Sequence, residues 1–429
     1  MRRYLEYKES GVDWIAEIPK HWKIKKIKHV ATFASQKSTP EADDIKISPE
    51  NVESKTGKVL DFYSSYDSMG VKFQVGDVLF NKIRVYLSKV VFAEYSGYSL
   101  GEMIVIKPSL QDIGKYLFYL MLSSRFIGYC NSISRGAKMP RTDVYDILNA
   151  QIPITSYQEQ TQIVNFLDRK TEQIDELIRI KERRIELLQE QRTALINQTV
   201  TKGLDPNVEV KPSGVEWIGE IPAHWEIKRL KHVAKILPSN VDKHIYPDEI
   251  QVRLCNYTDV YYNDYITVDT VLKKGSCKER EFTKFVLRKG DVIITKDSET
   301  PDDIGVPTFV KDNLDNVVCG YHLTLIRPYA CLGEFIFRFI QSDRTRRYFE
   351  LESNGITRYG LGKPSIENLL LPIPTDSEQQ QIANFLDRKT EQIDDLIATE
   401  HQKIKLLKEY RQSLISEAVT GKIDVRNEV

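Results

Sequence analysis

The feature that most constrains this chain is an internal duplication. The residues NFLDRKTEQID occur at Asn165–Asp175 and again, unchanged, at Asn384–Asp394. The stretch SGVDWIAEIPKHWKIKKIKHVA at Ser10–Ala31 returns as SGVEWIGEIPAHWEIKRLKHVA at Ser213–Ala234, with sixteen of twenty-two positions identical. The offset is 203 residues between the two opening stretches and 219 between the two later ones, so the second half carries sixteen additional residues. A repeat of this kind predicts two copies of one structural unit.

Between these repeats lie two blocks, about 32–157 and 235–377, that do not repeat each other. Both are rich in Val, Ile, Tyr, Phe and Thr and are broken by Gly, Pro, Asn and Asp, which is typical of short strands joined by turns. Each block also contains one apolar run that predicts a helix. Each is therefore expected to be an α+β unit. The expected strands are GDVLF at 76–80, GEMIVIKP at 101–108, GDVII at 290–294 and GYHLTLIRP at 320–328, and the expected helices are 113–124 and 333–343.

Each half ends in a long segment without Gly or Pro, from 158 to about 200 and from 378 to about 419. Strong helix formers dominate both segments, and apolar residues recur at spacings of four and three, which indicates a coiled-coil seam. About forty residues would give rods of roughly 60 Å. We expect the two helices to pair antiparallel around a pseudo-twofold axis, with the blocks at the two ends of the rod. The residues predicted to form the helix and partner interface are Phe166, Leu167, Ile174, Ile178, Ile185, Leu188, Leu195, Phe385, Leu386, Ile393, Ile397, Ile404, Leu407 and Leu414.

Lys181 and Glu400 occupy equivalent positions in the two predicted seams. In an antiparallel pair two such residues need not meet, and partial exposure is the simpler expectation. Leu177, Leu187, Leu396 and Leu406 widen the apolar stripe, which predicts that the helices contact more than one neighbour.

Composition excludes several classes of protein. The 429 residues suggest two to four domains, and no apolar run approaches the ~18 residues of a membrane span. The start, MRRYLEYKES, lacks the apolar region of a secretory signal. Five scattered cysteines suit a reducing cytoplasm and form neither a zinc cage nor a disulfide framework. The net charge of zero argues against a protein that simply coats nucleic acid, although local basic surfaces are compatible with it.

Catalytic motifs are missing from the sequence. Neither G-x-G-x-x-G nor the phosphate loop G-x-x-x-x-G-K-[ST] is present, and GLGKPS at 360–365 fails the second pattern because Pro364 replaces the Ser or Thr. The repeated histidines and tryptophans, for example His21 and Trp22 with His224 and Trp225, have no nearby metal-ligand cluster. They are interpreted as packing residues. An enzyme with an unrecognised site is the least favoured class.

Taken together, these residues resemble the DNA-specificity (S) subunit of type I restriction–modification systems. The resemblance is carried by G-V-x-W-I-x-E-I-P-x-H-W in both openings, by G-D-V-L-F-N-K-I-R and G-D-V-I-I-T-K, by P-I-P before each Gln/Glu-rich helix start, and by the duplicated NFLDRKTEQID. It covers essentially the whole chain in the expected order. Single motifs such as G-D-V are weak, whereas the duplicated opening and helix around divergent blocks form a strong signal.

The resemblance implies two globular target-recognition domains separated by two long antiparallel coiled-coil helices. The segments would be a first recognition domain at 1–157, a first spacer helix at 158–205, a second recognition domain at 206–377, and a second spacer helix with the tail at 378–429. Each domain would read one half of a bipartite, asymmetric site in double-stranded DNA. Two methyltransferase subunits would dock on the helices, and restriction subunits would join them. The chain itself would be non-catalytic and bind no cofactor, with S-adenosylmethionine and ATP/Mg belonging to its partners.

Candidate DNA contacts are basic or polar residues on exposed loops, because phosphate contacts use Lys and Arg and base edges are read by Arg, Lys, Asn, Gln or Ser. Two loops hold matching positions, 132–143 and 353–365, and a second pair, 81–89 and 295–303, follows the Gly-Asp-Val strands. A solvated loop is the alternative for each, and the second member of the second pair is acidic. The candidate DNA-binding residues are Arg135, Lys138 and Arg141 with Arg358, Tyr359 and Lys363 in the first pair, and Lys82 and Arg84 with Lys296 in the second.

Two functions from different classes therefore remain at this point. The first is a DNA-reading scaffold. The second is a protein-interaction scaffold built on a coiled coil, which the zero net charge favours. Steep salt dependence of DNA binding would separate them, because phosphate contacts release counterions.

Overall fold

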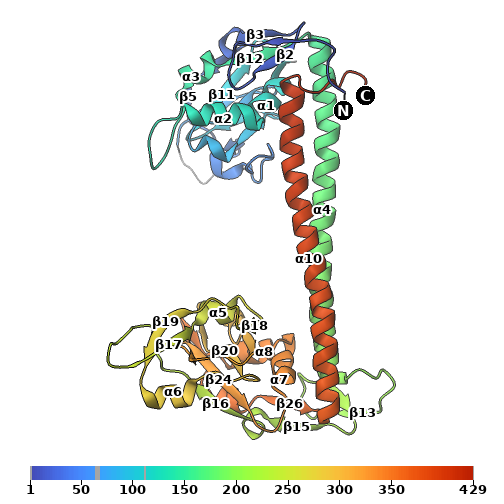
Figure 1. Ribbon diagram of the computed structural model, residues 1–429. Coiled ribbons are helices and arrows are strands. Elements are labelled where there is room, and N and C mark those ends of the chain that lie inside the picture. The colour runs from blue at the N-terminus through green and yellow to red at the C-terminus, as the bar shows by residue number, and fades with distance from the viewer. Residues whose placement is uncertain (1, 63–67, 111–112, 429) are drawn as a thin grey trace. The chain divides into compact units, whose positions relative to one another are not determined.

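The computed structural model describes residues 2–62, 68–110 and 113–428 (Figure 1). The chain divides into two compact units. Unit 1 comprises Met1–Glu182 with Glu400–Val429, and unit 2 comprises Arg183–Thr399. Each unit therefore contains one divergent block and one portion of each long helix. This division by compactness cuts through both helices, whereas the division predicted from the sequence follows the repeats.

The block of unit 1 is built on two four-stranded sheets, ordered β4-β11-β8-β9 and β5-β7-β10-β6, with short helices packed beside them. The first sheet is antiparallel throughout. The strands are β1 (Tyr7–Glu9), β2 (Glu17–Pro19), β3 (Lys23–Lys26), β4 (Ala31–Ala34), β5 (Lys37–Ser38), β6 (Lys46–Ile47), β7 (Gly70–Phe73), β8 (Val78–Asn81), β9 (Val90–Phe92), β10 (Gly97–Ser99), β11 (Met103–Pro108) and β12 (Gln151–Ile154). The helices are α1 (Gly114–Leu122), α2 (Ser124–Ser132) and α3 (Val144–Asn149), with 3-10 turns η1 (Ile27–His29), η2 (Pro49–Asn51) and η3 (Val85–Leu87).

Unit 2 has the corresponding five-stranded sheet, ordered β16-β24-β20-β22-β18, and a three-stranded sheet, β19-β17-β23. Its strands are β13 (Val210–Pro212), β14 (Glu220–Pro222), β15 (Glu226–Arg229), β16 (Ala234–Pro238), β17 (Ile250–Cys255), β18 (Tyr265–Ile266), β19 (Lys273–Cys277), β20 (Val292–Thr295), β21 (Asp297–Ser298), β22 (Pro307–Val310), β23 (Val317–Cys319), β24 (Leu323–Pro328), β25 (Tyr359–Gly360) and β26 (Leu370–Ile373). Its helices are α5 (Tyr257–Tyr261), α6 (Glu279–Phe285), α7 (Gly333–Ile340), α8 (Asp343–Glu352) and α9 (Lys363–Glu367), with 3-10 turns η5 (Leu230–His232) and η6 (Pro301–Asp303).

The α+β expectation for the blocks is confirmed, with one refinement at the predicted helices. The run 113–124 is α1 followed at once by the start of α2, and the run 333–343 is α7 followed by the start of α8. A serine causes each break. The side chains of Ser123 and Ser342 cap the second helix by accepting a hydrogen bond from a backbone N–H in its first turn.

The repeated openings fold as packed corners against the long helices. The indoles of Trp22 and Trp225 are fully buried. His21 contacts Glu159 and His224 contacts Glu378, each at 2.9 Å between imidazole Nε2 and a carboxylate oxygen. The two tryptophans are therefore packing residues, as predicted, whereas the two imidazoles are about half exposed and pair with the carboxylates. Among the residues that the structure describes, no group of three or more His, Cys, Asp or Glu could hold a metal ion.

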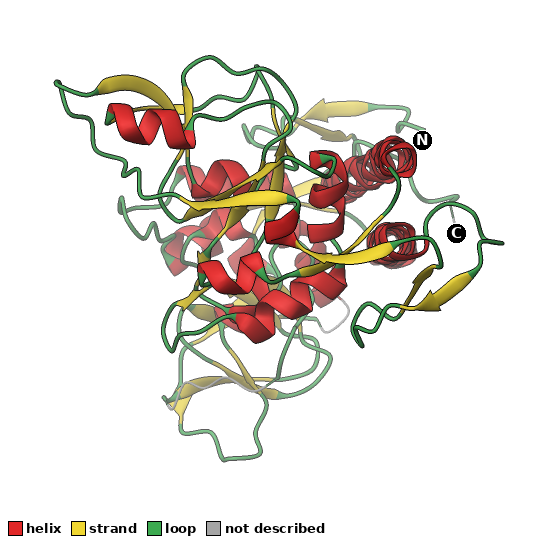
Figure 2. Cartoon of the chain, turned by 90° about the horizontal axis from the view of Figure 1, so that it is seen from below, coloured by secondary structure: helices red, strands yellow, loops and turns green. Residues whose placement is uncertain are grey.

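Two long helices, α4 (Tyr157–Lys202) and α10 (Asp376–Val419), pair antiparallel and lie side by side when seen end-on (Figure 2). At the start of α10, Thr375 and Glu378 exchange the two hydrogen bonds of a capping box. At the start of α4, the Ser156 hydroxyl accepts from the backbone N–H of Glu159. Each helix ends at a glycine in the left-handed region, Gly203 or Gly421. No helix in the described ranges is long and apolar enough to cross a bilayer.

The predicted seam residues are largely buried by contacts within the chain. Fully or nearly fully buried are Phe166, Leu167, Ile174, Ile178, Ile185, Leu188, Leu386, Ile393, Ile404 and Leu414, and half-buried are Leu195, Phe385, Ile397 and Leu407. The expectation of partial exposure is confirmed for Lys181, whose side chain is 22% exposed, and wrong for Glu400. The two residues meet, at 2.9 Å between Lys181 Nζ and a Glu400 carboxylate oxygen, and the Glu400 side chain is only 2% exposed. Removing this carboxylate from water requires a partner, which the antiparallel register supplies.

The Lys181–Glu400 pair makes stability depend on pH. Hydrogen bonds from Lys181 and then Lys403 hold the pKa of Glu400 at about 2, against about 4.3 in an unfolded chain. Because the folded pKa is depressed, the stabilisation is complete above about pH 4.3 and is lost as pH falls toward 2. We expect Glu400→Gln to lower the unfolding midpoint at pH 7, with the gap to the unmodified protein narrowing as pH falls below about 4.3. Thermal unfolding followed by circular dichroism at a series of pH values measures this gap.

Glu182→Gln is the matched control, because Glu182 is an exposed carboxylate on the same stretch of α4. It should leave the midpoint nearly unchanged at every pH. A gap for Glu400→Gln that stays constant down to pH 3 would contradict the ion-pair explanation.

Candidate nucleic-acid interface

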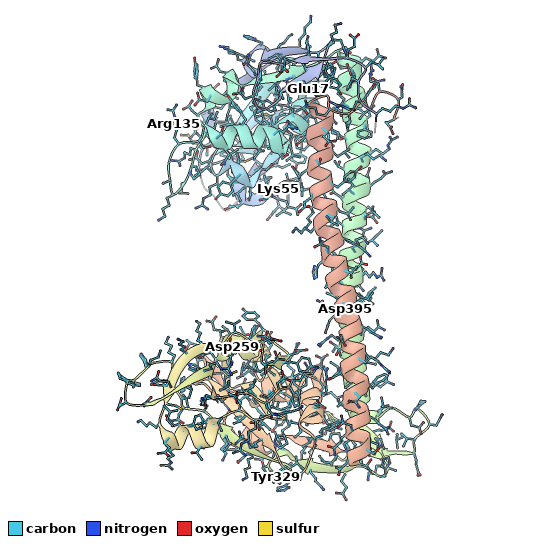
Figure 3. The ribbon with its side chains drawn as sticks, in the orientation of Figure 1. Glu17, Lys55, Arg135, Asp259, Tyr329 and Asp395 are labelled. Carbon is cyan, nitrogen blue, oxygen red and sulfur yellow. The ribbon has the colours of Figure 1, made fainter. Side chains whose placement is uncertain are left out.

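In unit 1 the two candidate loops, which are about fifty residues apart in sequence, lie against each other. The backbone N–H of Arg84 donates to Pro140 O at 2.7 Å, and that of Thr142 donates to Lys82 O at 2.9 Å. Arg135 and Arg141 exchange two backbone hydrogen bonds, which close the 132–143 loop as a hairpin. The loop follows α2, and Arg135 lies far from α10, whereas Lys55 lies next to that helix (Figure 3). The five basic candidates of this unit therefore belong to one surface, and we call its two segments the unit 1 loops.

The basic side chains of the unit 1 loops differ in their partners. Arg141 and Lys82 both bind the carboxylate of Glu102, at 2.6 and 3.3 Å, and Arg135 approaches Asp146 at 3.7 Å. Arg84 and Lys138 are exposed, and within the described residues no ion pair of either is recorded.

The backbone at Arg84 is strained. Its φ of 46° places a non-glycine residue in the left-handed region, which L-residues adopt at some energetic cost. The hydrogen bond to Pro140 O holds that conformation in place. Strain of this kind tends to collect at functional positions. The Arg84 side chain is therefore presented from a tightly held turn.

Unit 2 repeats the arrangement with different residues. The N–H of Leu361 donates to Lys296 O at 2.8 Å, β21 pairs with β25, and Asn354 exchanges two hydrogen bonds with Gly360. The segments 295–303 and 353–365, which we call the unit 2 loops, thus occupy the same relation to β20 that the unit 1 loops occupy to β8. The loops predicted from the sequence to be equivalent, 132–143 with 353–365 and 81–89 with 295–303, form corresponding backbone hydrogen bonds in the two units.

The charges of the unit 2 loops gather around Asp297. Its carboxylate accepts from Arg358 at 2.7 Å and contacts His322 Nδ1 at 2.6 Å. Lys296 lies beside this group, donates to Ser239 O at 2.8 Å and stacks 4.6 Å above the centre of the Tyr321 ring. Burial lowers the pKa of Lys296, and the nearby Asp297 partly opposes that shift.

Two unit 2 candidates do not join this cluster. Tyr359 packs against the hydrophobic core of the unit, and Lys363 begins α9, where it pairs with Glu367 at 3.1 Å along the helix. Glu102 and His322 were not among the residues predicted from the sequence, because each precedes a buried strand and is remote in sequence from the arginine beside it. Their shared position before β11 and β24 was the one signal that could have identified them.

The helices carry a second candidate surface. Within the two copies of NFLDRKTEQID, the side chains of Asn165, Arg169 and Glu172, and those of Asn384, Arg388 and Glu391, are exposed. Their spacing of four and three places each set along one face of its helix. We call each set a docking stripe. Exposed apolar residues occur further along the same helices, namely Leu177, Ile180, Leu187, Leu396, Leu406 and Tyr410.

Comparison with known proteins identifies the family. The family described as Type I restriction modification DNA specificity domain matches residues 19–189 and 222–408. The chain therefore belongs to this family and is a type I restriction–modification specificity subunit that recognises DNA sequence. Such subunits are not themselves enzymes.

Individual relatives agree along most of the chain. The MjaVIII specificity subunit of Methanocaldococcus jannaschii is 25% identical over 73% of this chain and 71% of its own length. The putative MjaX specificity subunit of the same organism is 22% identical over 96% of both. Among solved structures, the fold resembles a chain from a structure on complex assembly and conformational transition of the type I system (TM-score 0.73, 16% identity, 95% of this chain and 99% of that one). It also resembles the HsdS subunit of Thermoanaerobacter tengcongensis (TM-score 0.53, 17% identity, 95% and 98%).

The conformation of the unit 2 loops depends on Gly355. A Cβ at this position would lie 2.0 Å from the carbonyl oxygen of Arg358, so the backbone would have to move. We expect Gly355→Ala to displace Arg358 and to weaken DNA binding by about tenfold or more, while the unfolding midpoint changes little because the loop is exposed. Fluorescence anisotropy with duplex DNA and thermal unfolding measure the two effects.

Gly360→Ala is the matched control in the same loop, because its Cβ would meet nothing closer than 3.9 Å. Equal DNA affinity of the two variants would show that the loop conformation has no part in binding.

Proposed function

We propose that this specificity subunit reads a bipartite, asymmetric DNA site, with the unit 1 loops contacting one half-site and the unit 2 loops the other. The observation that carries the proposal is the pair of loop clusters. Both are built on the same strand ends by the same backbone hydrogen bonds, yet their exposed side chains differ. Proteins identify bases through side chains that contact the base edges. Two loop clusters with the same backbone and different side chains can therefore recognise two different DNA sequences.

The proposed contacts divide by chemistry. Lys138, Arg135 and Lys82 in unit 1 and Lys296 and Lys363 in unit 2 are assigned to phosphate oxygens, as lysine is a point charge and phosphate contacts position a protein on the duplex. Arg84, Arg141 and Arg358, with Tyr359 at the edge of the unit 2 loops, are assigned to the major groove. The balanced net charge is compatible with this division because a local group of basic residues can bind phosphates even where the total charge of the chain is zero.

The modular part of the proposal is tested by exchange of one block. The segment 32–157 is replaced by the corresponding block of another specificity subunit, and the chain is co-expressed with its methyltransferase. Because the unit 2 loops are unchanged, we expect the methylated motif to change in one half-site only. Genome-wide mapping of methylated adenines by single-molecule sequencing gives the motif. A change in both half-sites would refute independent reading.

Binding that is insensitive to salt would instead favour the alternative of a protein-interaction scaffold. Phosphate contacts make the logarithm of affinity fall linearly with the logarithm of salt concentration.

The long helices are proposed to hold two copies of one methyltransferase subunit, one on each docking stripe. Support comes from the residues that the repeat keeps. Half-buried members of NFLDRKTEQID have contacts within the chain, for example Asp168 with Lys115 and Asp387 with Arg338. The exposed members are equally unchanged. A repeated external partner accounts for their identity, and the exposed leucines Leu177 and Leu396 add apolar area beside the stripes.

Restriction subunits are proposed to join the same assembly. S-adenosylmethionine and ATP with Mg²⁺ are assigned to the partner subunits, and no cofactor is assigned to this chain. The five cysteines are free thiols, which suits the reducing cytoplasm in which the DNA is found.

Stoichiometry tests the docking proposal. A charge reversal at one stripe, Arg169→Glu or Arg388→Glu, should reduce the complex from two methyltransferase copies to one, and the double variant should bind none. Native mass spectrometry of the co-purified complex counts the copies directly.

Arg179→Glu is the control, because this arginine is exposed on α4 beyond the repeat and its counterpart is Ala398. Full assembly by the double variant would exclude the stripes as the docking surface.

A further inference from the structure

One carboxylate stands between the two loops of unit 1. Glu102 precedes β11 and binds Arg141 from one loop and Lys82 from the other. The Glu102 side chain is 28% exposed, whereas the Arg141 side chain is 55% exposed. The acid is therefore partly shielded while the guanidinium faces solvent. A charge-assisted hydrogen bond of 2.6 Å in this setting is strong for its class.

Unit 2 has a carboxylate with the same role at a different place in the sequence. Asp297 follows β20, binds Arg358 and contacts His322. Its side chain is 15% exposed, against 58% for Arg358. Again a shielded acid holds an exposed arginine through a single terminal nitrogen, Nη2.

The two arrangements are equivalent in the fold and differ in residue type. Lys82 donates its backbone N–H to Glu102 O at 3.1 Å, and Lys296 donates to His322 O at 3.0 Å. Glu102, which precedes β11, and His322, which precedes β24, thus occupy equivalent positions in the two units. In unit 2 the acid is instead Asp297, which follows the neighbouring strand β20. Both blocks keep an acid–arginine pair although their sequences diverge, which general packing requirements do not explain for exposed arginines.

The chemistry of the pair points to base reading. A guanidinium has five N–H donors in a rigid planar fork. A carboxylate that binds one terminal nitrogen restricts the orientation of the fork and leaves the remaining N–H groups available. The commonest specific contact in the major groove is an arginine that donates twice to O6 and N7 of guanine. Fixing the fork before binding reduces the entropy lost on binding.

We propose that Glu102 and Asp297 are positioning residues that set sequence specificity, each orienting an arginine, Arg141 or Arg358, to read the edge of a guanine in its own half-site. The inference rests on the proposed function. It assigns one guanine–cytosine pair of each half-site to one acid–arginine pair. Arg135 and Lys138, which have no such oriented fork, do not contribute base preference.

The test uses the complete methyltransferase complex and the map of methylated adenines. Glu102→Gln keeps the shape of the side chain and removes its charge. We expect a single position in the unit 1 half-site to lose its preference for guanine by about tenfold, while the unit 2 half-site is unchanged. Asp297→Asn should give the reverse pattern. In each variant the untouched half-site is an internal control.

Arg141→Lys and Arg358→Lys form the second set of variants. They keep the charge and remove the fork, so they should relax the same positions as the acid variants do. Glu176→Gln and Glu186→Gln are controls, because each removes an exposed carboxylate that pairs with a basic residue along a helix. Both should leave the motif intact.

Several outcomes would overturn the inference. An unchanged motif in Glu102→Gln and Asp297→Asn would show that the acids do not affect reading. Equal loss of binding to all sequences together with a shallower salt dependence would assign the arginines to phosphates. A lowered unfolding midpoint with an unchanged motif would make the acids structural. If the unmodified complex yields no bipartite motif, the proposed function itself fails, and that result is separate from these.

Discussion

In each unit one arginine ties both long helices to the globular block. In unit 1, Arg411 of α10 binds Asp175 of α4 at 3.0 Å and donates to the carbonyl oxygens of Lys55 and Thr56 in the block. In unit 2, Arg192 of α4 binds Asp394 of α10 at 3.0 Å and Asp264 of the block at 2.7 Å. The Arg411 side chain is only 7% exposed, so its charge is stable there because several acceptors replace the lost water.

These arginines explain part of the strict repeat. Asp175 and Asp394 are the last residues of the two NFLDRKTEQID copies, and each accepts the arginine of the opposite helix. An antiparallel pairing with this register brings the aspartate of one copy beside the arginine that follows the other copy. Changing Asp175 would leave the shielded Arg411 guanidinium without its carboxylate partner, which is costly. Changing Asp394 would remove one of the two carboxylates that bind Arg192. Identity at these aspartates therefore follows from the internal structure of each unit. Arg169 in the first stripe donates to the backbone oxygen of Glu428, and no corresponding bond of Arg388 is found in the described residues, so a shared internal contact does not account for identity at the stripe positions.

The divergent blocks show which parts of a fold can vary while its scaffold is retained. The strand ends at Asn81 and Thr295 and the hairpins that follow α2 and α8 are held by matching backbone hydrogen bonds. Backbone groups carry no sequence information, so these bonds survive extensive substitution. The side chains that the loops expose are free to change. In both units a shielded carboxylate binds an exposed arginine of the loops. The acid is Glu102 in unit 1, where it binds Arg141, and Asp297 in unit 2, where it binds Arg358.

The sequence by itself determined the duplication, the two long helices, the α+β character of the blocks and the loops that carry the basic residues. Those features depend on local periodicity, capping and turn residues, all of which can be seen within a few residues of one another. Only the tertiary structure decided which charges meet. Glu102 lies 39 residues from Arg141, and Lys181 lies 219 residues from Glu400. Such pairs depend on strand order and on the register of an antiparallel helix pair. A one-turn change in that register would place different side chains opposite each other without altering any local sequence signal.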